Sequence, residues 1–270
     1  MSLCLDCNLF TIKGKSVKEN KYVHIFIMWL SAVLKHGGLT AADVLHLKID
    51  SDTFEYLKTQ IAFSGLINRK ICQIQIMLYP PPETIGDGMA VRYVKVNGMR
   101  DVYMYCDIDI LIIKPLRPLY ESLPINTISV HAEGRLSDDN YGAAFTAEEK
   151  TELSFQPGFS SGKFIIHGRE LYSQFVDMMA MIYKRNHPSY FTIDQPLFNK
   201  TLYLLIKDPN QFNMIPSTFI SSNGHHFTKD CILLDAMGMP GDGDMHFDKI
   251  INFFSLLQSG ALETTFLKRA

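Results

Sequence analysis

Two aspartates one residue apart interrupt a long apolar run, and no other feature of the chain constrains its fold as strongly. The run extends from Tyr103 to Leu116, and the aspartates are Asp107 and Asp109. Aromatic and β-branched residues before the pair predict a buried strand over about 101–106 that ends at the carboxylates. In an extended chain, side chains at i and i+2 lie on the same side of the sheet.

Buried carboxylates without partners are costly, so we expect this pair to meet cations, hydrogen-bond donors or water at a sheet edge. A hard divalent cation, completed by the phosphates of a substrate, satisfies that demand. The alternative is a surface turn with two solvated aspartates. The apolar strand before the pair and the Ile110 to Ile113 run after it argue against this alternative.

Composition limits the class of protein. The chain has 270 residues, of which 47% are hydrophobic, so it can bury a large core, and we expect a single domain over 1–270. The net charge of -2 and the lack of a basic stripe argue against a nucleic-acid partner. Five cysteines in apolar segments favour reduced thiols. Cys4 and Cys7 have Cys-x-x-Cys spacing, which leaves open a zinc or redox pair or two ordinary thiols in the first strand.

The N-terminal segment 1–10 lacks a cationic region followed by an apolar stretch, so it does not resemble a secretory signal. The longest apolar run, 22–34, is shorter than the roughly 20 residues that a membrane span needs. We therefore expect a protein with no intrinsic membrane anchor and a cytoplasmic location.

Strands alternate with helical stretches in the first half, which predicts an α/β fold with a mostly parallel central sheet flanked by helices. The segment after 121 changes texture and includes a polar loop over 133–141. Ser51 or Asp52 is the expected cap of the second helix. The patterns predict strands at 3–12, 44–49, 71–79, 101–106, 126–130, 162–167, 212–219 and 231–234, and helices at 22–34, 52–61, 86–97, 169–185, 195–206 and 250–257.

The segment from Tyr105 to Glu121 resembles the "YLDADxLVxxPLxxLFE" signature of glycosyltransferases with the GT-A fold, of the glycogenin and galactosyltransferase type and of bacterial or viral kind. The resemblance implies a GT-A fold for the whole chain. It also implies that Asp107 and Asp109, with Ile108 between them, bind the donor through Mn²⁺ or Mg²⁺, which bridges the diphosphate of a nucleotide-sugar.

Two further segments resemble parts of the same family. Arg92 lies fifteen residues before Asp107 on the predicted helix, where relatives place a basic residue that contacts the donor, and Lys95 is a weaker candidate. The segment 158–166 resembles "YFNSGVMLI" and implies that Ser161 and Gly162 lie against the donor sugar. Ser160 replaces the usual asparagine there.

The segment 192–199 resembles "DQxxLN", which implies catalytic roles for Asp194 and Gln195. Asp194 also suits a helix N-cap, with Pro196 in the first turn, so both interpretations stay open. A later part of the family signature, "HxxGxxKPW", matches only in part. Asp235 stands at the position of its metal-binding histidine and His246 follows, so either could be the third metal ligand, and we place His246 first.

The nucleotide base is expected near the end of the first strand, at Thr11, Ile12 and Lys13. Asp50 and Asp52 at the end of the second strand are further candidates, since ligands of open α/β sheets gather at strand carboxyl ends.

The resemblance implies a metal-dependent glycosyltransferase that moves a hexose from a UDP-linked donor to a hydroxyl of a glycan or other acceptor. Residues 1–120 would bind the nucleotide-sugar, and 121–270 the acceptor. In an inverting enzyme Asp194, or the loop with Asp138 and Asp139, would be the base. In a retaining enzyme Asp194 or Gln195 would stabilise the oxocarbenium-like centre. The alternatives are a phosphohydrolase that uses Asp107 and Asp109, a sugar-phosphate nucleotidyltransferase, and a non-catalytic carbohydrate- or nucleotide-binding protein.

Overall fold

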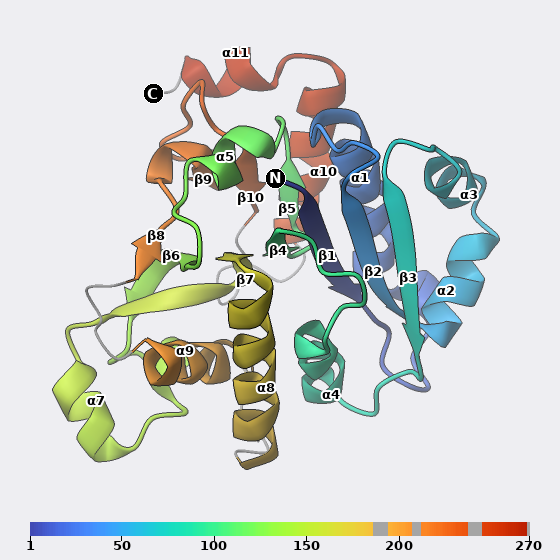
Figure 1. Ribbon diagram of the computed structural model, residues 1–270. Helices are drawn as coiled ribbons and strands as arrows, with labels where there is room; N and C mark the ends of the chain where they lie inside the picture. The colour runs from blue at the N-terminus through green and yellow to red at the C-terminus, as the bar shows by residue number, and fades with distance from the viewer. Residues whose placement is uncertain (186–193, 207–211, 237–244, 269–270) are drawn as a thin grey trace.

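Four parallel strands form one half of the central sheet (Figure 1). The computed structural model describes residues 1–185, 194–206, 212–236 and 245–268. In it β1 (Leu3–Leu9) lies between β2 (Val44–Asp50) and β4 (Val102–Cys106), and β3 (Gln73–Tyr79) pairs with β2 at the edge. Polar groups at the carboxyl ends of these strands therefore share one edge of the sheet.

The other half of the sheet reverses direction. The long strand β7 (Pro157–His167) is antiparallel to β4, so the start of β7 lies beside the end of β4. β6 (Ile128–Arg135) is antiparallel to β7, and β8 (Asn213–Met214) is parallel to β6. The sheet order is β3-β2-β1-β4-β7-β6-β8. The predicted α/β class is confirmed, and its mostly parallel character belongs to the first half.

A small second sheet follows directly after the aspartate pair. β5 (Ile110–Ile112) is antiparallel to β10 (Leu233–Asp235), which is parallel to β9 (Ile220–Ser222). Asp235 is the register partner of Ile110, so the late strand comes back beside the motif.

Helices cover both faces of the sheet. On one face α1 (Lys21–His36) packs against α10 (Met245–Gln258), with Trp29 fully buried. On the other, α8 (Arg169–Arg185) and α9 (Asp194–Leu205) pack on β7, where Phe164 is fully buried. The remaining described helices are the short η1 (Val17–Glu19), α2 (Ser51–Lys58), α3 (Ile61–Ile67), α4 (Ile85–Ala90), η2 (Val91–Tyr93), α5 (Arg117–Glu121), α6 (Asp139–Gly142), α7 (Ala147–Leu153), η4 (Ser217–Phe219) and α11 (Leu262–Leu267).

Several predicted boundaries were wrong for identifiable reasons. The cap of α2 is Asp50, whose side chain accepts the N–H groups of Asp52 and Thr53, so the helix begins one residue before the predicted start. The predicted helix 86–97 stops after α4 and a single 3-10 turn. The polar segment 133–141 is a loop only in part, because β6 continues to Arg135 and α6 begins at Asp139.

None of the helices in the described ranges is long and apolar enough to cross a membrane.

Candidate active site

The aspartate pair lies in a tight turn between β4 and β5, and not in extended chain as the spacing suggested. Asp107 follows the last residue of β4, and its carbonyl accepts the N–H of Ile110 at 3.1 Å. Its own N–H donates to the carbonyl of Gly162 on β7 at 2.8 Å. The pairing of β4 with β7 therefore fixes the first aspartate at the predicted sheet edge, with 28% of its side chain exposed.

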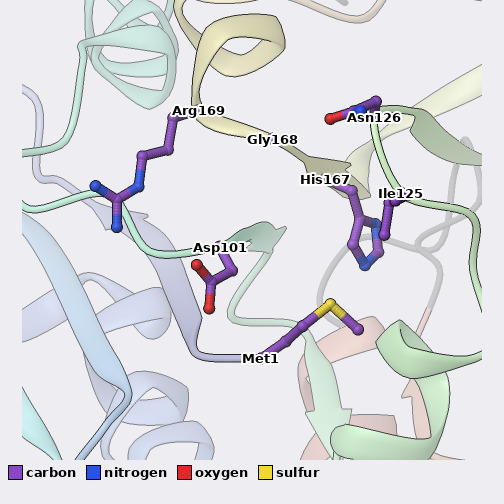
Figure 2. Close-up of a pocket in the computed structure, with 7 residues that line it drawn as sticks. All are labelled: Met1, Asp101, Ile125, Asn126, His167, Gly168 and Arg169. Atoms are coloured by element: carbon purple, nitrogen blue, oxygen red, sulfur yellow. The ribbon is translucent and has the colours of Figure 1, made fainter.

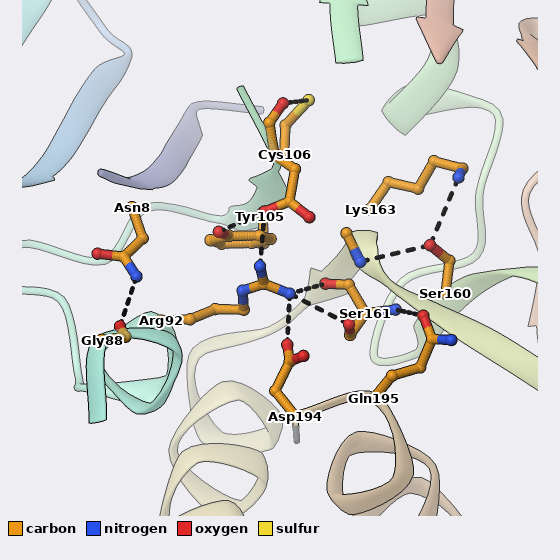
Figure 3. A network of polar contacts seen from close by, with 12 residues as sticks. Asn8, Gly88, Arg92, Tyr105, Cys106, Ser160, Ser161, Lys163, Asp194 and Gln195 are labelled. Atoms are coloured by element: carbon orange, nitrogen blue, oxygen red, sulfur yellow. Dashed lines mark hydrogen bonds and ion pairs between the residues drawn. The ribbon is translucent and has the colours of Figure 1, made fainter. Parts of the chain in front are cut away.

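Arg92 connects the motif to the other candidate segments (Figure 3). From the buried 3-10 turn η2, its guanidinium donates to Asp107 Oδ1 at 2.7 Å and to Asp194 Oδ2 at 2.6 Å. It also donates to the carbonyl and hydroxyl oxygens of Ser161, both at 3.1 Å. Burial disfavours the charged guanidinium, but the two carboxylates raise the pKa of Arg92 well above its usual value. The rigid fork of arginine suits this bridging role.

Two tyrosines that sequence reasoning missed complete this network. The hydroxyl of Tyr105 donates to Asp107 Oδ1 at 2.8 Å, and the Arg92 guanidinium lies over its ring at 4.5 Å. The hydroxyl of Tyr93 donates to Asp194 Oδ2 at 3.2 Å. The signal for Tyr105 was available, because an extended chain over 101–106 would place it on the same side of the sheet as a residue two positions later, which is Asp107.

The start of β7 lies against the aspartate turn through small residues. A Cβ atom on Gly162 would lie 2.6 Å from Asp107 Oδ2, closer than a real carbon approaches. Ser160 Oγ accepts the N–H of Gly162 at 3.3 Å, so this hydroxyl serves the local backbone. Gly162 thus allows the close approach of the Asp107 carboxylate, while the expected contact of this segment with the donor sugar stays a prediction.

Asp194 and Gln195 begin α9 beside this segment. Asp194 Oδ2 is committed to Arg92 and Tyr93, and no hydrogen bond joins Oδ1 to another described residue. Gln195 Oε1 accepts the N–H of Ser161 at 3.3 Å. Asn199 fixes the helix on β7 by bonding both the N–H and the carbonyl of Phe159, at 2.8 and 2.9 Å. The structure therefore brings both predicted catalytic residues to the aspartate turn.

Negative charge is concentrated around Asp109. Burial and the charges of Asp107 and Asp235 raise the pKa of Asp109 to about 8. Burial also raises the pKa of Asp107, to about 6, although Arg92 opposes that rise. Carboxylates that raise each other's pKa in this way are suited to a divalent cation, which would relieve the repulsion. Among the described residues, no three His, Cys, Asp or Glu side chains are already gathered as a metal site.

The two candidates for a third ligand approach this pair by different routes. The N–H of Ala236 donates to the carbonyl of Asp109 at 3.2 Å, which places Asp235 directly beside the motif. His246, in the first turn of α10, lies with Nε2 3.5 Å from the hydroxyl of Tyr22. Burial, then the charges of Asp109 and Asp107, raise the pKa of Tyr22, so this tyrosine lies close enough to the aspartates to respond to their charges.

A buried lysine that the sequence did not single out lies next to Asp235. Lys163 on β7 donates to Asp235 Oδ2 at 2.6 Å and to Glu133 Oε1 on β6. Burial favours neutral lysine, but Asp235 and Glu133 raise the pKa of Lys163. Glu133, which also lies 3.3 Å from Nδ1 of His131, has its pKa lowered to about 2 because His131 and Lys163 outweigh the effect of burial.

The segment predicted to hold the nucleotide base follows β1 at the same edge of the sheet. Thr11 is already bonded, its N–H to Asp50 Oδ2 at 2.9 Å and its hydroxyl to Thr53 at 2.8 Å. Ile12 is half-buried, and Lys13 pairs with Glu83 at 2.5 Å. Asp50 therefore organises the loop and caps α2, and its contacts do not test the expectation that the base binds in this segment.

Other predicted candidates point elsewhere. Lys95 donates to Ser173 on α8 at 2.6 Å, away from the aspartate turn. Asp139 is exposed and pairs with Lys150 at 2.7 Å. Cys4 and Cys7 are buried in different clusters on opposite faces of the sheet, so they cannot share one metal ion.

A hollow of about 320 Å³ lies at the opposite end of the sheet (Figure 2). Asp101 precedes β4 and His167 ends β7, whereas the aspartate turn follows β4 and Gly162 lies near the start of β7. The strand length therefore separates this hollow from the candidate site. Its lining residues are Met1, Asp101, Ile125, Asn126, His167, Gly168 and Arg169.

No protein-family model matches this sequence, and no curated protein matches it. Solved structures nevertheless share its fold. Mouse xyloside xylosyltransferase 1 is 16% identical, with a TM-score of 0.52 over 92% of this chain and 94% of its own. The galactosyltransferase LgtC, solved with donor and acceptor sugar analogues, is 11% identical, with a TM-score of 0.55 over 94% and 95%.

The glycosyltransferase GlyE of Streptococcus pneumoniae is 10% identical, with a TM-score of 0.56 over 97% of this chain. This chain spans only 63% of that protein. These likenesses confirm the GT-A fold that the motifs implied.

Proposed function

We propose that the protein is a metal-dependent glycosyltransferase that moves a hexose from a nucleoside diphosphate sugar, most simply UDP-linked, to a hydroxyl of a glycan or other acceptor. The observation that carries this proposal is the position of Arg92. One buried guanidinium binds Asp107, Ser161 and Asp194 at 2.6 to 3.1 Å. These residues come from three segments that each resemble a glycosyltransferase signature, and they meet on a GT-A fold.

The donor diphosphate would lie against the aspartate turn. Mn²⁺ or Mg²⁺ would be held by Asp107 and Asp109, with Asp235 or His246 as a further ligand, and would neutralise the charge that develops on the departing diphosphate. Gly162 leaves room for Asp107, and the half-exposed wall at Ile12 would contact the base. Residues 1–120 would thus form the donor half.

The sugar would lie between Ser161 and the start of α9. Asp194 is held by Arg92 and Tyr93 through one oxygen, so Oδ1 could accept a hydroxyl of the sugar or acceptor. In a retaining reaction Asp194 or Gln195 would stabilise the positive charge on the anomeric carbon. In an inverting reaction Asp194 would take the proton from the acceptor hydroxyl. The acceptor would then contact residues of the 121–270 half.

A panel of UDP-sugars, assayed for donor hydrolysis and transfer with and without Mn²⁺, tests this proposal. We expect turnover that requires metal, and a loss of at least about a hundredfold when Asp107→Asn and Asp109→Asn remove the charges but keep the side-chain shapes. Asp139→Asn removes a carboxylate that is 87% exposed and serves as the matched control.

The alternatives give different results in the same assay. Turnover that stays unchanged in the Asp107→Asn, Asp109→Asn variant would overturn the proposed site. Release of inorganic phosphate from phosphomonoesters would indicate a phosphohydrolase. Metal-dependent thermal stabilisation by UDP without any turnover would indicate a non-catalytic binding protein.

A further inference from the structure

Lys163 is a charged side chain with no access to solvent. The proposed reaction does not require a lysine at this position. It is 0% exposed and lies between two nearly buried carboxylates, Asp235 at 5% and Glu133, whose side chain is 9% exposed. Its ammonium lies 2.6 Å from Asp235 Oδ2 and 3.4 Å from Ser160 Oγ. Because a buried ammonium is costly without partners, both carboxylates are needed to keep this lysine in place.

The backbone places this triad of Lys163, Asp235 and Glu133 directly beside the aspartate turn. Lys163 is the register partner of Cys106, the residue before Asp107. Asp235 is the partner of Ile110, the residue after Asp109. A fixed positive charge therefore lies next to the carboxylates that are proposed to hold a divalent cation, and it holds one oxygen of a candidate third ligand.

A lysine in this position opposes the binding of metal in two ways. Its charge repels a second cation, and its hydrogen bond occupies Asp235 Oδ2. Glu133 moderates both effects, because it shares the ammonium with Asp235. Glu133 and Asp235 thus compete for the ammonium of Lys163. Asp235 is in turn shared between this lysine and the proposed metal site.

We propose that Lys163 is a built-in counter-cation that competes with the divalent metal for Asp235 and keeps the metal affinity of the donor site low. This inference rests on the proposed function. Weak metal binding would serve turnover, because a loosely held cation would not retain the nucleoside diphosphate after transfer. Lys163 is a positioning residue in this account, because it acts on Asp235 and does not touch the substrate.

The proposal predicts that substitutions of Lys163 and of Glu133, which form one ion pair, change the Mn²⁺ affinity in opposite directions. Lys163→Met removes the competing charge and frees Asp235 Oδ2, so Mn²⁺ should bind about tenfold more tightly. Glu133→Gln leaves Asp235 as the only carboxylate bonded to the lysine, so Mn²⁺ should bind more weakly, by up to about tenfold. The double variant should lie between them.

Isothermal titration of the donor-free protein with Mn²⁺ tests this without any reference to catalysis. Lys163→Arg, which keeps the charge, should bind Mn²⁺ as the wild type does. If Lys163 has only a structural role, Lys163→Met and Glu133→Gln will both weaken binding and both lower the Tm, which would overturn the proposal. Glu133→Gln preserves side-chain shape and decides the question through its Tm if Lys163→Met does not fold: weaker binding at an unchanged Tm supports the proposal, whereas weaker binding with a lower Tm, or unchanged binding, overturns it.

The wild type provides the reference for the proposed function. One outcome is that Mn²⁺ binding is lost in Asp107→Asn, Asp109→Asn, while Lys163→Met and Glu133→Gln change the Mn²⁺ affinity in the same direction. That outcome would refute only the role of Lys163. A wild type that does not bind Mn²⁺ at all would refute both the metal site and the counter-cation.

Discussion

The position of the Asp107 carboxylate depends on the absence of a side chain at Gly162. The glycine lies within β7, and an added Cβ would meet Asp107 Oδ2 at 2.6 Å. We expect Gly162→Ala to displace this carboxylate and lower kcat/KM by about a hundredfold, since a misplacement of about 1 Å can have that effect. The far-UV circular dichroism should not change, because alanine fits an extended strand.

Gly65→Ala is the matched control for that substitution. Gly65 lies in α3 with no atom within 4 Å of an added Cβ. Alanine there should raise the free energy of unfolding by up to about 1 kcal/mol and leave kcat/KM unchanged. Full activity in Gly162→Ala would contradict the contact with Asp107.

Arg92 permits a test of geometry at constant charge. Its guanidinium binds Asp107 and Asp194 through different nitrogens, and a lysine ammonium cannot reach both in that way. Each hydrogen bond to a charged group contributes about 1.5–3 kcal/mol, so Arg92→Lys should lower kcat/KM about tenfold to about 150-fold. Arg69→Lys, at an exposed position after α3, should have no effect in the same assay.

At the scale of elements, the 3-10 turn that carries Arg92 is supported by a buried lysine from the neighbouring sheet. Lys48 on β2 donates to the backbone carbonyl of Arg92 at 2.7 Å and to Asp6 Oδ2 on β1 at 2.8 Å. Tyr103 on β4 donates to the same carboxylate oxygen at 2.7 Å, and Asp6 Oδ1 lies 3.0 Å from His46 Nδ1. Three strands therefore anchor one turn of the site.

We expect Lys48→Met to lower the free energy of unfolding by about 3–5 kcal/mol, because it leaves the carboxylate of Asp6 buried without its main cation. Adding Asp6→Asn to Lys48→Met should recover part of this loss of stability. The kcat should be low in both variants, because the carbonyl of Arg92 has lost its hydrogen bond from Lys48. Lys58→Met on α2, where the lysine is 47% exposed and paired with Glu55, should change stability by less than about 1 kcal/mol. Urea unfolding and steady-state kinetics of the wild type and the three variants provide the measurements. If Lys48→Met is no less stable than Lys58→Met, the anchoring role is wrong.

How far the sequence predicts the fold differs between elements. The helix α8 was predicted with its observed bounds, and the ends of β3 and β4 were predicted because Pro80 and Asp107 follow them. The helix after Gly86 was predicted too long, since η2 ends at Tyr93 and the N–H of Val96 donates to the hydroxyl of Tyr172 instead of continuing the helix. β5 was not predicted, because a run of isoleucines does not show where the chain joins a second sheet.

Sequence patterns predicted those residues of the candidate site that lie in a local motif. They missed the residues that only the fold brings together. Asp107, Asp194 and Ser161 each lie in a recognisable segment. Lys163 and Glu133 have no such signal, because their charges are paired only through the antiparallel contact of β6 with β7. A lysine in an apolar strand was visible in the sequence, but its partners were not.

At the scale of the whole molecule, the two halves of the sheet meet at the charged side chains of the candidate site. The parallel strands bring the aspartate turn and the loop after β1 to one edge, and the antiparallel β7 brings Ser161 to the same place. Burial and neighbouring carboxylates raise the pKa values of Asp107 and Asp109 at this junction, so the ionised pair destabilises the folded protein. The same crowding would favour the proposed divalent cation.

This crowding predicts how the stability of the metal-free protein depends on pH. The pKa values of Asp107 and Asp109 are raised from 3.8 to about 6 and about 8, so the folded protein holds protons that the unfolded chain releases. The contribution of the pair to the free energy of unfolding must therefore fall as the pH rises from about 4 to about 8. Histidines with lowered pKa values, such as His36, act in the opposite direction over part of this range, so the wild type must be compared with a variant.

Asp107→Asn, Asp109→Asn removes the titrating pair, and in EDTA it should become progressively more stable than the wild type between pH 5 and pH 8. Urea unfolding at each pH gives this difference directly, with Asp139→Asn as the control for loss of an exposed carboxylate. Mn²⁺ should stabilise the wild type most at the alkaline end, where fewer protons compete for the carboxylates, and should leave the double variant unchanged. A difference between wild type and variant that stays constant with pH would show that the pKa values of the two aspartates are not raised in the folded protein.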